Sequence, residues 1–522
     1  MKNLVLGAAI SAAMLSGAAQ AAISVDETTG LPLINTANTN VVYLSGASAA
    51  RKFMEELFTN SAVAPAEAIC DSTKPIWKYK DSINGKKQNA YLCELSAANL
   101  AISGLAKPNL LIYKRSEGGS AQGVSPLIAD AKGLASAAIE FLKIDNSACT
   151  LGAAPVAGIS LGSVTCDYDL TDATKFDSLI PDFGVSDVDP GQFKDANTPA
   201  GFDAVSTADV ALLNVQGTAA LTFGIPVTTG LRDALQEAQI ATGDIATSCT
   251  VGDETKACMP SLTKAQIASI YTGQITSWDQ LKVGTSGLFS GATSPAASPR
   301  VHICRRVEGS GTQAQHGIKF LNFPCSTAAS RPAKAAGVPE FFPVTQVHEL
   351  SSSGDVTDCL NELNAGSDTD TGNDFNNIFP GQRWAVGIQS LEKNADLGDD
   401  FRFIKVDGVA PTLENVASGK YYDWVELTFQ YSNTHAWLDD NQAIVDAVIA
   451  SAGNPVVLAA LNGKFKHSFG DSGLLAVPTI YPLAAHAELD LSGPVNPYTH
   501  ATGGAPVDNC RIPAVLNSDL QL

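Results

Sequence analysis

Lysine and arginine are scarce in this sequence. Its 522 residues hold 33 Lys and Arg against 53 Asp and Glu, a formal net charge of −20. Proteins that bind nucleic acids need clustered cations to displace counterions from phosphates, so we expect no nucleic-acid partner. Charged residues make up only 16% of the chain and hydrophobic residues 45%, which is a globular composition. The length predicts two to four folding units, and no repeat or biased run indicates a fibrous or low-complexity protein.

Long apolar runs are also missing. The one pronounced run, from Leu4 to Leu15, is too short for a bilayer, which needs about 20 residues. It follows Lys2 and precedes Ala19-Gln20-Ala21, an order typical of a cleaved secretory signal. We therefore predict a signal peptide over residues 1–21 and a periplasmic or secreted location.

The sequence has no Cys-x-x-Cys pair, which removes support for zinc ribbons and thioredoxin-type redox sites. The ten cysteines are an even number, which indicates disulfides in an exported chain. Proximity suggests the pairs 70–93, 149–166, 249–258 and 304–325, which leaves 359–510. The spacing does not settle the connectivity, and a few free buried thiols are the alternative. The seven histidines are scattered, so we predict no structural metal and no cofactor.

Short β-branched or apolar runs alternate with helical patterns along the chain. Four such runs end in turns of small or polar residues and lie at 40–44, 109–113, 180–184 and 301–304. Further expected elements are a hairpin at 76–92 around Asn84-Gly85, a strand with a crossover in 210–224, a helix at 264–271 and strands at 384–388 and 401–406. This alternation predicts an α/β fold with mostly parallel sheets, in which ligands bind beyond the carboxyl ends of the strands. Segments at about 59–108, 130–178 and 326–380 are expected to decorate that core.

The turns after these strands carry a common chemistry. They are Ser45–Ser48, Gly119-Ser120, Ser186-Asp187 and the run from Arg306 to Thr312. Hydroxyls and backbone N–H groups at helix starts donate to the oxygens of small anions, and a guanidinium can bond two oxygens at once. A carboxylate repels a fully ionised anion but accepts the proton of a protonated one. The set therefore predicts a site for a protonated tetrahedral oxyanion such as hydrogen phosphate.

The order of these motifs resembles a known family. The matching pieces are Leu44-Ser-Gly-Ala-Ser-Ala-Ala50, Gly119-Ser-Ala-Gln-Gly-Val124, Asp182-Phe-Gly-Val-Ser-Asp187, Tyr271-Thr-Gly-Gln-Ile-Thr-Ser-Trp-Asp279, Arg305-Arg-Val-Glu-Gly-Ser-Gly-Thr312 and Trp384-Ala-Val-Gly-Ile388. Together they resemble the phosphate-binding protein of bacterial ABC-type phosphate import systems, a type II periplasmic binding protein. The piece with Arg305-Arg306 is the most specific.

This resemblance implies a two-lobed α/β clamp with two hinge crossovers that closes on its ligand. One lobe would comprise residues 22–222 and 426–522, and the other residues 223–425. Phosphate or a similar oxyanion would be the ligand, and an ABC permease in the inner membrane a possible partner. The ligand residues implied position by position are Ser120, Asp187, Arg306, Ser310, Gly311 and Thr312, with the turn from Ser48 to Arg51.

The match is incomplete at the first turn. Where the family has Thr-Phe, this chain has Ala50-Arg51, so one hydroxyl ligand is lost while both backbone N–H groups remain. Ser48 can replace that hydroxyl, and we expect the side chain of Arg51 to point to solvent. Glu308 stands where the family usually has Asp and is expected to orient Arg306.

An enzyme and a scaffold protein are the two alternatives to anion binding. Gly470-Asp471-Ser472-Gly473 and Ala484-Ala-His486 look like the nucleophile and histidine segments of trypsin-like proteases, but here the histidine follows the serine, whereas in that family it precedes it. A phosphatase would need a nucleophile with a base or paired metals, and no such cluster is evident in the sequence. The third reading is an exported scaffold or surface protein that reuses the binding fold.

Overall fold

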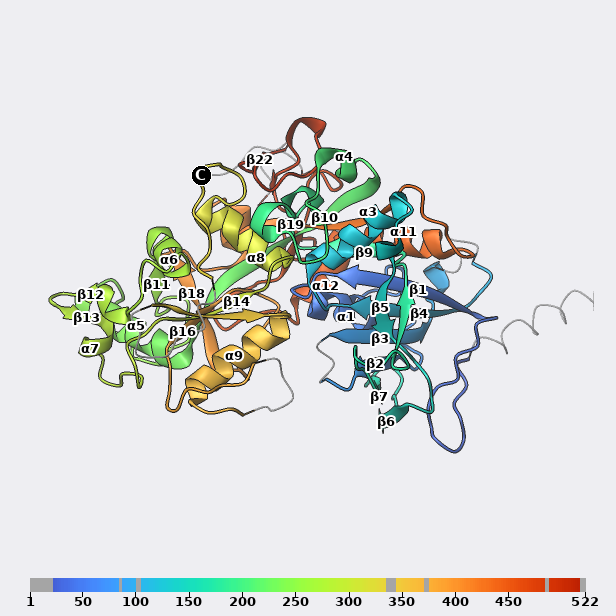
Figure 1. Ribbon diagram of the computed structural model, residues 1–522, viewed down its shortest axis with the longest axis horizontal. Coiled ribbons are helices and arrows are strands. Elements are labelled where there is room, and N and C mark those ends of the chain that lie inside the picture. Colours follow the sequence, from blue (N-terminus) through green and yellow to red (C-terminus); the bar gives the residue numbers. More distant parts are fainter. Residues whose placement is uncertain are drawn as a thin grey trace, which may run out of the picture.

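The structure, a computed structural model, describes residues 22–83, 87–99, 105–334, 344–369, 375–483 and 488–516. Three predictions fall outside the described residues: the signal peptide at 1–21, the turn at Asn84-Gly85 and the segment Ala484–His486. Among the described residues, one 16-stranded mixed sheet runs through the molecule, with helices on its faces (Figure 1).

The first part of the sheet is built around β1 (Thr39–Gly46). β1 pairs in parallel with β4 (Asn109–Arg115) and β9 (Phe183–Ser186). Beyond β4 the order continues through β3 (Gln88–Glu94), β2 (Trp77–Asp81), β7 (Gly162–Cys166) and β6 (Cys149–Ala153). The expected hairpin is confirmed, since β2 and β3 are antiparallel.

The segments 59–108 and 130–178 are therefore more than decorations, because they supply four strands of the main sheet. They also bring antiparallel pairs, as do the long strands described below, so the expectation of mostly parallel sheets is wrong. A separate two-stranded sheet in the second segment pairs β5 (Ile139–Leu142) with β8 (Phe176–Leu179).

Helices bury apolar side chains against this part of the sheet and form a first core. In α1 (Arg51–Thr59) Phe53, Met54, Leu57 and Phe58 are buried, a spacing that places them on one helical face. The other helices here are α3 (Ser125–Ala131), α4 (Thr207–Val210), α11 (Asn441–Gly453) and α12 (Pro455–Asn462), with the 3-10 turns η1 (Ser120–Gly123), η2 (Ala135–Ala137), η3 (Pro190–Gln192) and η4 (Asp195–Asn197).

A second core forms around the other part of the sheet. Its strands are β11 (Ser261–Leu262), β14 (His302–Arg306), β15 (Gln346–Leu350), β16 (Ala385–Gly387), β17 (Gln389–Ser390) and β18 (Phe401–Val406), and a small hairpin joins β12 (Lys282–Val283) to β13 (Ser286–Gly287). Its helices are α5 (Thr229–Thr242), α6 (Lys264–Tyr271), α7 (Leu288–Gly291), α8 (Gly311–His316), α9 (Ser353–Ala365) and α10 (Leu413–Ala417), with η5 (Trp278–Gln280) and the π-helical turn η6 (Gly317–Leu321).

The long strand β10 (Leu213–Thr228) connects the two cores. Its first part pairs with β19 (Trp424–Ser432) and β20 (Leu474–Ala476), and its last residues pair with β18. The chain returns to the first core where β19 begins. Each core has its own helices, so the expected two-lobed α/β architecture with two crossovers is confirmed. The lobe boundaries given above remain a prediction. The remaining small elements lie in the C-terminal tail: β21 (Tyr498–Thr499), η7 (Thr502–Gly504) and β22 (Ala514–Val515).

All ten cysteines form disulfides. The pairs 70–93, 149–166 and 249–258 are confirmed. The other two expected pairs are wrong: Cys304 bonds to Cys359, and Cys325 bonds to Cys510. Sequence proximity failed because Cys304 on β14 packs against α9, which carries Cys359, while Cys325 faces the C-terminal tail.

No single helix in the described ranges is long and apolar enough to cross a membrane. The bent pair α11 and α12 passes that test only as a pair, across a 64° break. Both helices are buried in the first core. Within the described residues, no three metal-ligating side chains lie together.

Candidate anion-binding site

Polar turns from distant parts of the chain meet in the interior. Asp187, directly after β9, donates its backbone N–H to Oγ of Ser120 at 3.2 Å. Thr312, in the first turn of α8, donates its hydroxyl to Oδ2 of Asp187 at 3.0 Å. All three residues are at most 1% exposed. The turn after β4, the end of β9 and the start of α8 therefore face one another.

Two glycines permit this close approach. A Cβ on Gly311 would lie 2.3 Å from Oγ of Ser120 and 2.9 Å from Cβ of Asp187. Gly119 has φ +72°, and a Cβ there would lie 3.0 Å from Cα of Ser310. A side chain at either position would push apart the segments that carry the polar groups.

Arg306 brings a buried guanidinium to the same place. It is 1% exposed. Its Nη1 donates to Oγ of Ser48 at 2.7 Å and to Oγ of Ser353 at 3.2 Å. Its Nε donates to the carbonyl of Leu350 at 3.0 Å, and its Nη2 donates to the carbonyl of Ser351. Burial lowers the pKa of Arg306 to about 10, so the group stays charged at neutral pH.

The carboxyl group of Asp187 is buried and only partly hydrogen-bonded. Burial raises its pKa to about 6, although Thr312, the charge of Arg306 and Ser120 each lower it. Its Oδ2 accepts from Thr312, but within the described residues its buried Oδ1 has no hydrogen-bond partner. Most buried polar atoms have partners, so this oxygen still has the capacity to accept a hydrogen bond.

Of the predicted ligand residues, the structure brings seven together, and we call them the convergence site. They are Ser48, Ser120, Asp187, Arg306, Ser310, Gly311 and Thr312. Ser310 is the N-cap of α8, where its Oγ accepts the N–H of Gln313, and it is 1% exposed.

Ala50 and Arg51 lie beside this group, at the start of α1. Arg51 is partly exposed, and its backbone N–H points to the carbonyl of Ser48 at 3.3 Å. The next two N–H groups of the helix, of Lys52 and Phe53, donate to the carboxylate of Glu392 at 3.1 and 2.8 Å. A negative side chain of the protein itself therefore satisfies the start of α1. The role of the Ala50 and Arg51 N–H groups remains a prediction.

The sequence reasoning missed three buried residues around the site. Glu392 caps α1, and Ser353 contacts both Ser48 and Arg306. Lys114, on β4, donates to the carbonyls of Gly46 and Arg115 and to Oγ of Ser116, at 2.9 to 3.1 Å. Burial lowers the pKa of Lys114 to about 7, and the charge of Asp187 opposes that shift. A lysine that ends an apolar strand just before Gly118-Gly119 was the available signal. Ser353 and Glu392 each lie more than 300 residues from a residue that they contact, and no sequence pattern pointed to either of them.

Two expectations about side chains are answered by the structure. Glu308 is exposed, and its charge acts on Arg305, so its expected role in orienting Arg306 is wrong. The carbonyls of Leu350 and Ser351 orient Arg306 instead. Ser472, the residue that suggested a protease, is fully buried and donates its hydroxyl to the carbonyl of Phe465. That contact is typical of a structural turn.

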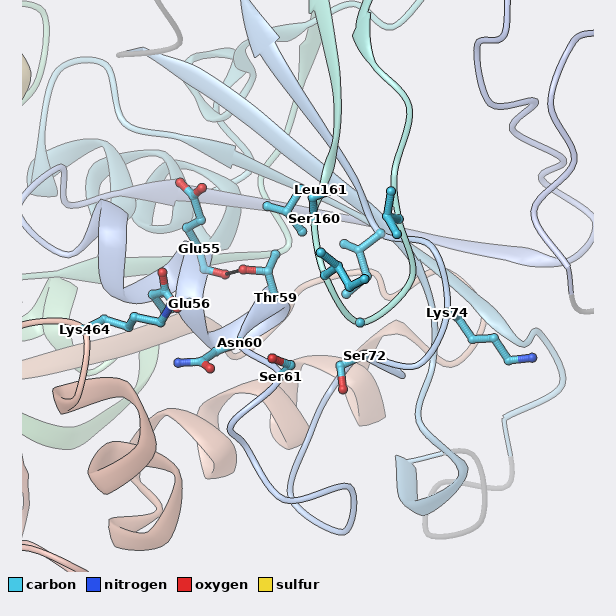
Figure 2. A pocket seen from close by; sticks show the side chains of 14 residues that line it. Glu55, Glu56, Thr59, Asn60, Ser61, Ser72, Lys74, Ser160, Leu161 and Lys464 are labelled. Atoms are coloured by element: carbon cyan, nitrogen blue, oxygen red, sulfur yellow. Dashed lines mark hydrogen bonds between the residues drawn. The ribbon is translucent and has the colours of Figure 1, made fainter.

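A separate polar pocket of about 200 Å³ lies at the far end of α1 (Figure 2). Glu55, Glu56 and Asn60 line it on one side, and the loop at 156–161 closes the other. Both oxygens of Glu55 are bound by Lys78 at 2.7 Å. The pocket shares no residue with the convergence site.

No family model matches the chain, and no curated protein matches it. Among solved structures, it is similar to a putative phosphate ABC transporter substrate-binding protein with bound phosphate from Clostridium perfringens, with 16% identity over 81% of this chain and 98% of that one and a TM-score of 0.36. It is also similar to PstS from Borrelia burgdorferi, with 11% identity, 81% and 97% coverage and a TM-score of 0.30. An ABC-type phosphate transport receptor from Vibrio cholerae matches with 14% identity, 52% and 74% coverage and a TM-score of 0.27.

Proposed function

We propose that this protein binds inorganic phosphate, or a closely related protonated tetrahedral oxyanion, at the convergence site. One observation carries the proposal: Oδ1 of Asp187 is buried near the charge of Arg306 and has no hydrogen-bond partner in the part of the chain that the structure describes. An anion that is itself a hydrogen-bond donor satisfies that oxygen, whereas sulfate, which has no proton at neutral pH, would meet a buried carboxylate without a donor.

The remaining groups supply donors for the other oxygens of the anion. Arg306 would exchange its hydrogen bonds to Ser48 and Ser353 for bonds to the anion. The hydroxyl of Ser120 and the N–H groups at the start of α8 are within the same cluster. Charge-assisted hydrogen bonds contribute about 1.5–3 kcal/mol each, so a handful can reach the roughly −8 kcal/mol of a micromolar complex after the cost of ordering the site.

We further infer an exported protein that captures its ligand for uptake by an ABC permease. Five disulfides support an oxidising compartment, and the signal-like sequence at 1–21 agrees with it. The net charge of −20 repels anions at long range, so binding must rely on the local donors. The role as a transport receptor follows from the motif resemblance described above.

Titration calorimetry of the purified protein with phosphate, and separately with sulfate at the same pH and ionic strength, tests this function. We expect saturable binding of phosphate with one site per chain and at least 100-fold weaker binding of sulfate. Absence of phosphate binding at millimolar concentration would overturn the proposal. Equal affinity for both anions would remove the role given to Asp187.

A further inference from the structure

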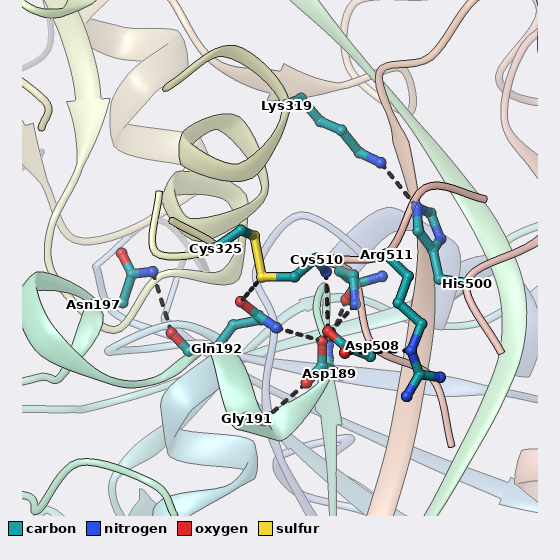
Figure 3. Close-up of a disulfide and its surroundings, with 11 residues drawn as sticks. Asp189, Gly191, Gln192, Asn197, Lys319, Cys325, His500, Asp508, Cys510 and Arg511 are labelled. Atoms are coloured by element: carbon teal, nitrogen blue, oxygen red, sulfur yellow. Dashed lines mark hydrogen bonds and ion pairs between the residues drawn. A yellow bond between two sulfur atoms is a disulfide. The ribbon is translucent and has the colours of Figure 1, made fainter. Parts of the chain in front are cut away.

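The C-terminal tail touches both cores of the molecule. Val495 belongs to the first core, and Tyr498 packs against the second. We call residues 494–510 the C-terminal strap. Figure 3 shows its end, where Cys510 lies between Asp189 and the chain that carries Cys325.

One end of the strap is fixed to the segment that carries Asp187. The N–H of Asp189 donates to Oδ1 of Asn509 at 2.7 Å, and the N–H of Asn509 donates back to Oδ2 of Asp189 at 2.9 Å. Both residues are buried. Asp189 is two residues from Asp187, so this reciprocal pair attaches the strap to the segment that carries Asp187.

The next residue of the strap is bonded covalently to the chain that follows α8 and η6. Cys510 forms a disulfide with Cys325, across 185 residues of sequence. Cys325 follows η6, the continuation of α8, and α8 begins with Gly311 and Thr312. The disulfide therefore ties the strap to the helix whose first turn faces Asp187.

The middle of the strap is pinned to the crossover strand β19. Thr499 and His500 both bond to the buried carboxylate of Glu426 on that strand. Lys319, on η6, contacts Nε2 of His500 at 3.0 Å (Figure 3). The strap thus contacts the connection between the two cores, the segment that follows β9 and the chain that continues from α8.

We propose that the C-terminal strap limits how far Asp187 and the start of α8 can separate, and so restrains opening of the anion site. This inference rests on the proposed function. One trans peptide unit spans about 3.8 Å, and the bridged Cα atoms of Cys325 and Cys510 lie 5.2 Å apart. These two lengths keep the Cα atom of Cys325 within about 9 Å of the Cα atom of Asn509, so Cys325 stays near Asp189 as long as Asn509 remains bonded to Asp189. The restraint slows both entry and release of the ligand, because each requires the segments to part.

The strap disulfide is also open to reduction. Cys325 and Cys510 are both partly exposed, whereas each of the other four disulfides has at least one buried cysteine. Its thiol–disulfide exchange therefore proceeds more readily than that of the others, since exchange needs access to sulfur. Exchange with a dithiol reductant, which is itself oxidised to a disulfide, would leave Cys325 and Cys510 as two thiols and remove the covalent attachment of the strap.

The test compares a Cys325→Ser/Cys510→Ser double variant with the wild type and with a matched control, Cys249→Ser/Cys258→Ser. The control removes a disulfide that closes only a short local loop, with a sequence separation of 9, in a small cluster of its own. Phosphate dissociation is measured by stopped-flow trapping, and the radius of gyration by small-angle X-ray scattering without ligand. We expect release about tenfold faster in the strap variant, with a larger ligand-free radius, and no change in the control.

Two further ways of loosening the strap test the same restraint. Asn509→Ala weakens the neighbouring attachment of the strap to Asp189 while all disulfides stay intact. Mild reduction with alkylation of the wild type replaces the double variant if that variant fails to fold. Both should speed phosphate release and expand the ligand-free protein. If phosphate does not bind the wild type, the proposed function fails, but the scattering comparison still tests the strap. Radii and release rates that match the control in all three strap-loosened forms would overturn the inference.

Discussion

The hydroxyl of Thr312 donates a 3.0 Å hydrogen bond to Oδ2 of Asp187, across 125 residues of sequence. The bond joins the end of β9 in the first core to the start of α8 at the edge of the second. It uses one carboxylate oxygen and leaves the other, Oδ1, without a partner among the described residues. The carboxylate is therefore bonded through one oxygen, and its other oxygen can accept the hydrogen bond that the proposed function requires.

Asp187→Asn tests whether this carboxylate makes the site prefer phosphate to sulfate. The amide keeps the shape of the side chain but can donate a hydrogen bond, so a proton on the anion is no longer required. We expect phosphate affinity to fall and sulfate affinity to rise, which narrows the ratio between them by tenfold or more. Calorimetry with both anions measures this ratio. Unchanged affinities for both would remove Asp187 from the site.

The same substitution should stabilise the ligand-free protein at neutral pH. Burial raises the pKa of Asp187 from 3.8 to about 6. The contribution of this carboxyl group to the free energy of unfolding is therefore fully present below pH 3.8 and is lost as the pH rises through 6. A shift of about two units corresponds to roughly 3 kcal/mol as an upper bound. Asp187→Asn should therefore raise the midpoint of urea unfolding at pH 7.5, and the gain should vanish near pH 4. A variant less stable than the wild type at pH 7.5 would contradict this account.

The sequence predicted that these turns would meet, because their residues follow strands of one sheet. Ser120, Asp187 and Arg306 each lie at or just after the carboxyl end of a strand, and such ends bring distant turns together. Helix α6 was predicted with its bounds, and β18 as well, since each has clear periodicity or a β-branched run.

What the sequence could not predict depends on contacts between distant segments. Glu392 gave no signal, because the helix that it caps lies more than 300 residues earlier. The disulfides at Cys325 and Cys304 were mispaired for the same reason, since proximity along the chain is a poor guide when a tail folds back. The hairpin of β2 and β3 was predicted, but its place in the main sheet was not, because short apolar runs do not reveal which distant strands they pair with.

Arg306→Lys tests whether the planar guanidinium is needed. Lysine keeps the charge but loses the bond from Nε to Leu350 and cannot hold two anion oxygens in one plane. We expect phosphate to bind about 100-fold more weakly, equivalent to about 2.7 kcal/mol. Arg305→Lys is the matched control, because the side chain of Arg305 bonds to Ala333, Glu349 and the backbone carbonyl of Arg306 and to no side chain of the convergence site. Equal losses in both variants would show that the effect is structural.

Gly311→Ala tests whether the two halves of the site must touch. A Cβ at this position would lie 2.3 Å from Oγ of Ser120, a distance that real Cβ atoms do not adopt, so α8 would have to move away from Asp187. Alanine also favours a helix over glycine by about 1 kcal/mol, so the helix itself should not be weakened. We therefore expect a folded protein with normal secondary structure by circular dichroism, phosphate affinity lower by tenfold or more, and a larger ligand-free radius in scattering. Gly493→Ala is the control, because a Cβ there meets no atom within 4 Å. Phosphate affinity in Gly311→Ala equal to that of the control would mean that the anion does not bind where Ser120, Asp187 and α8 converge.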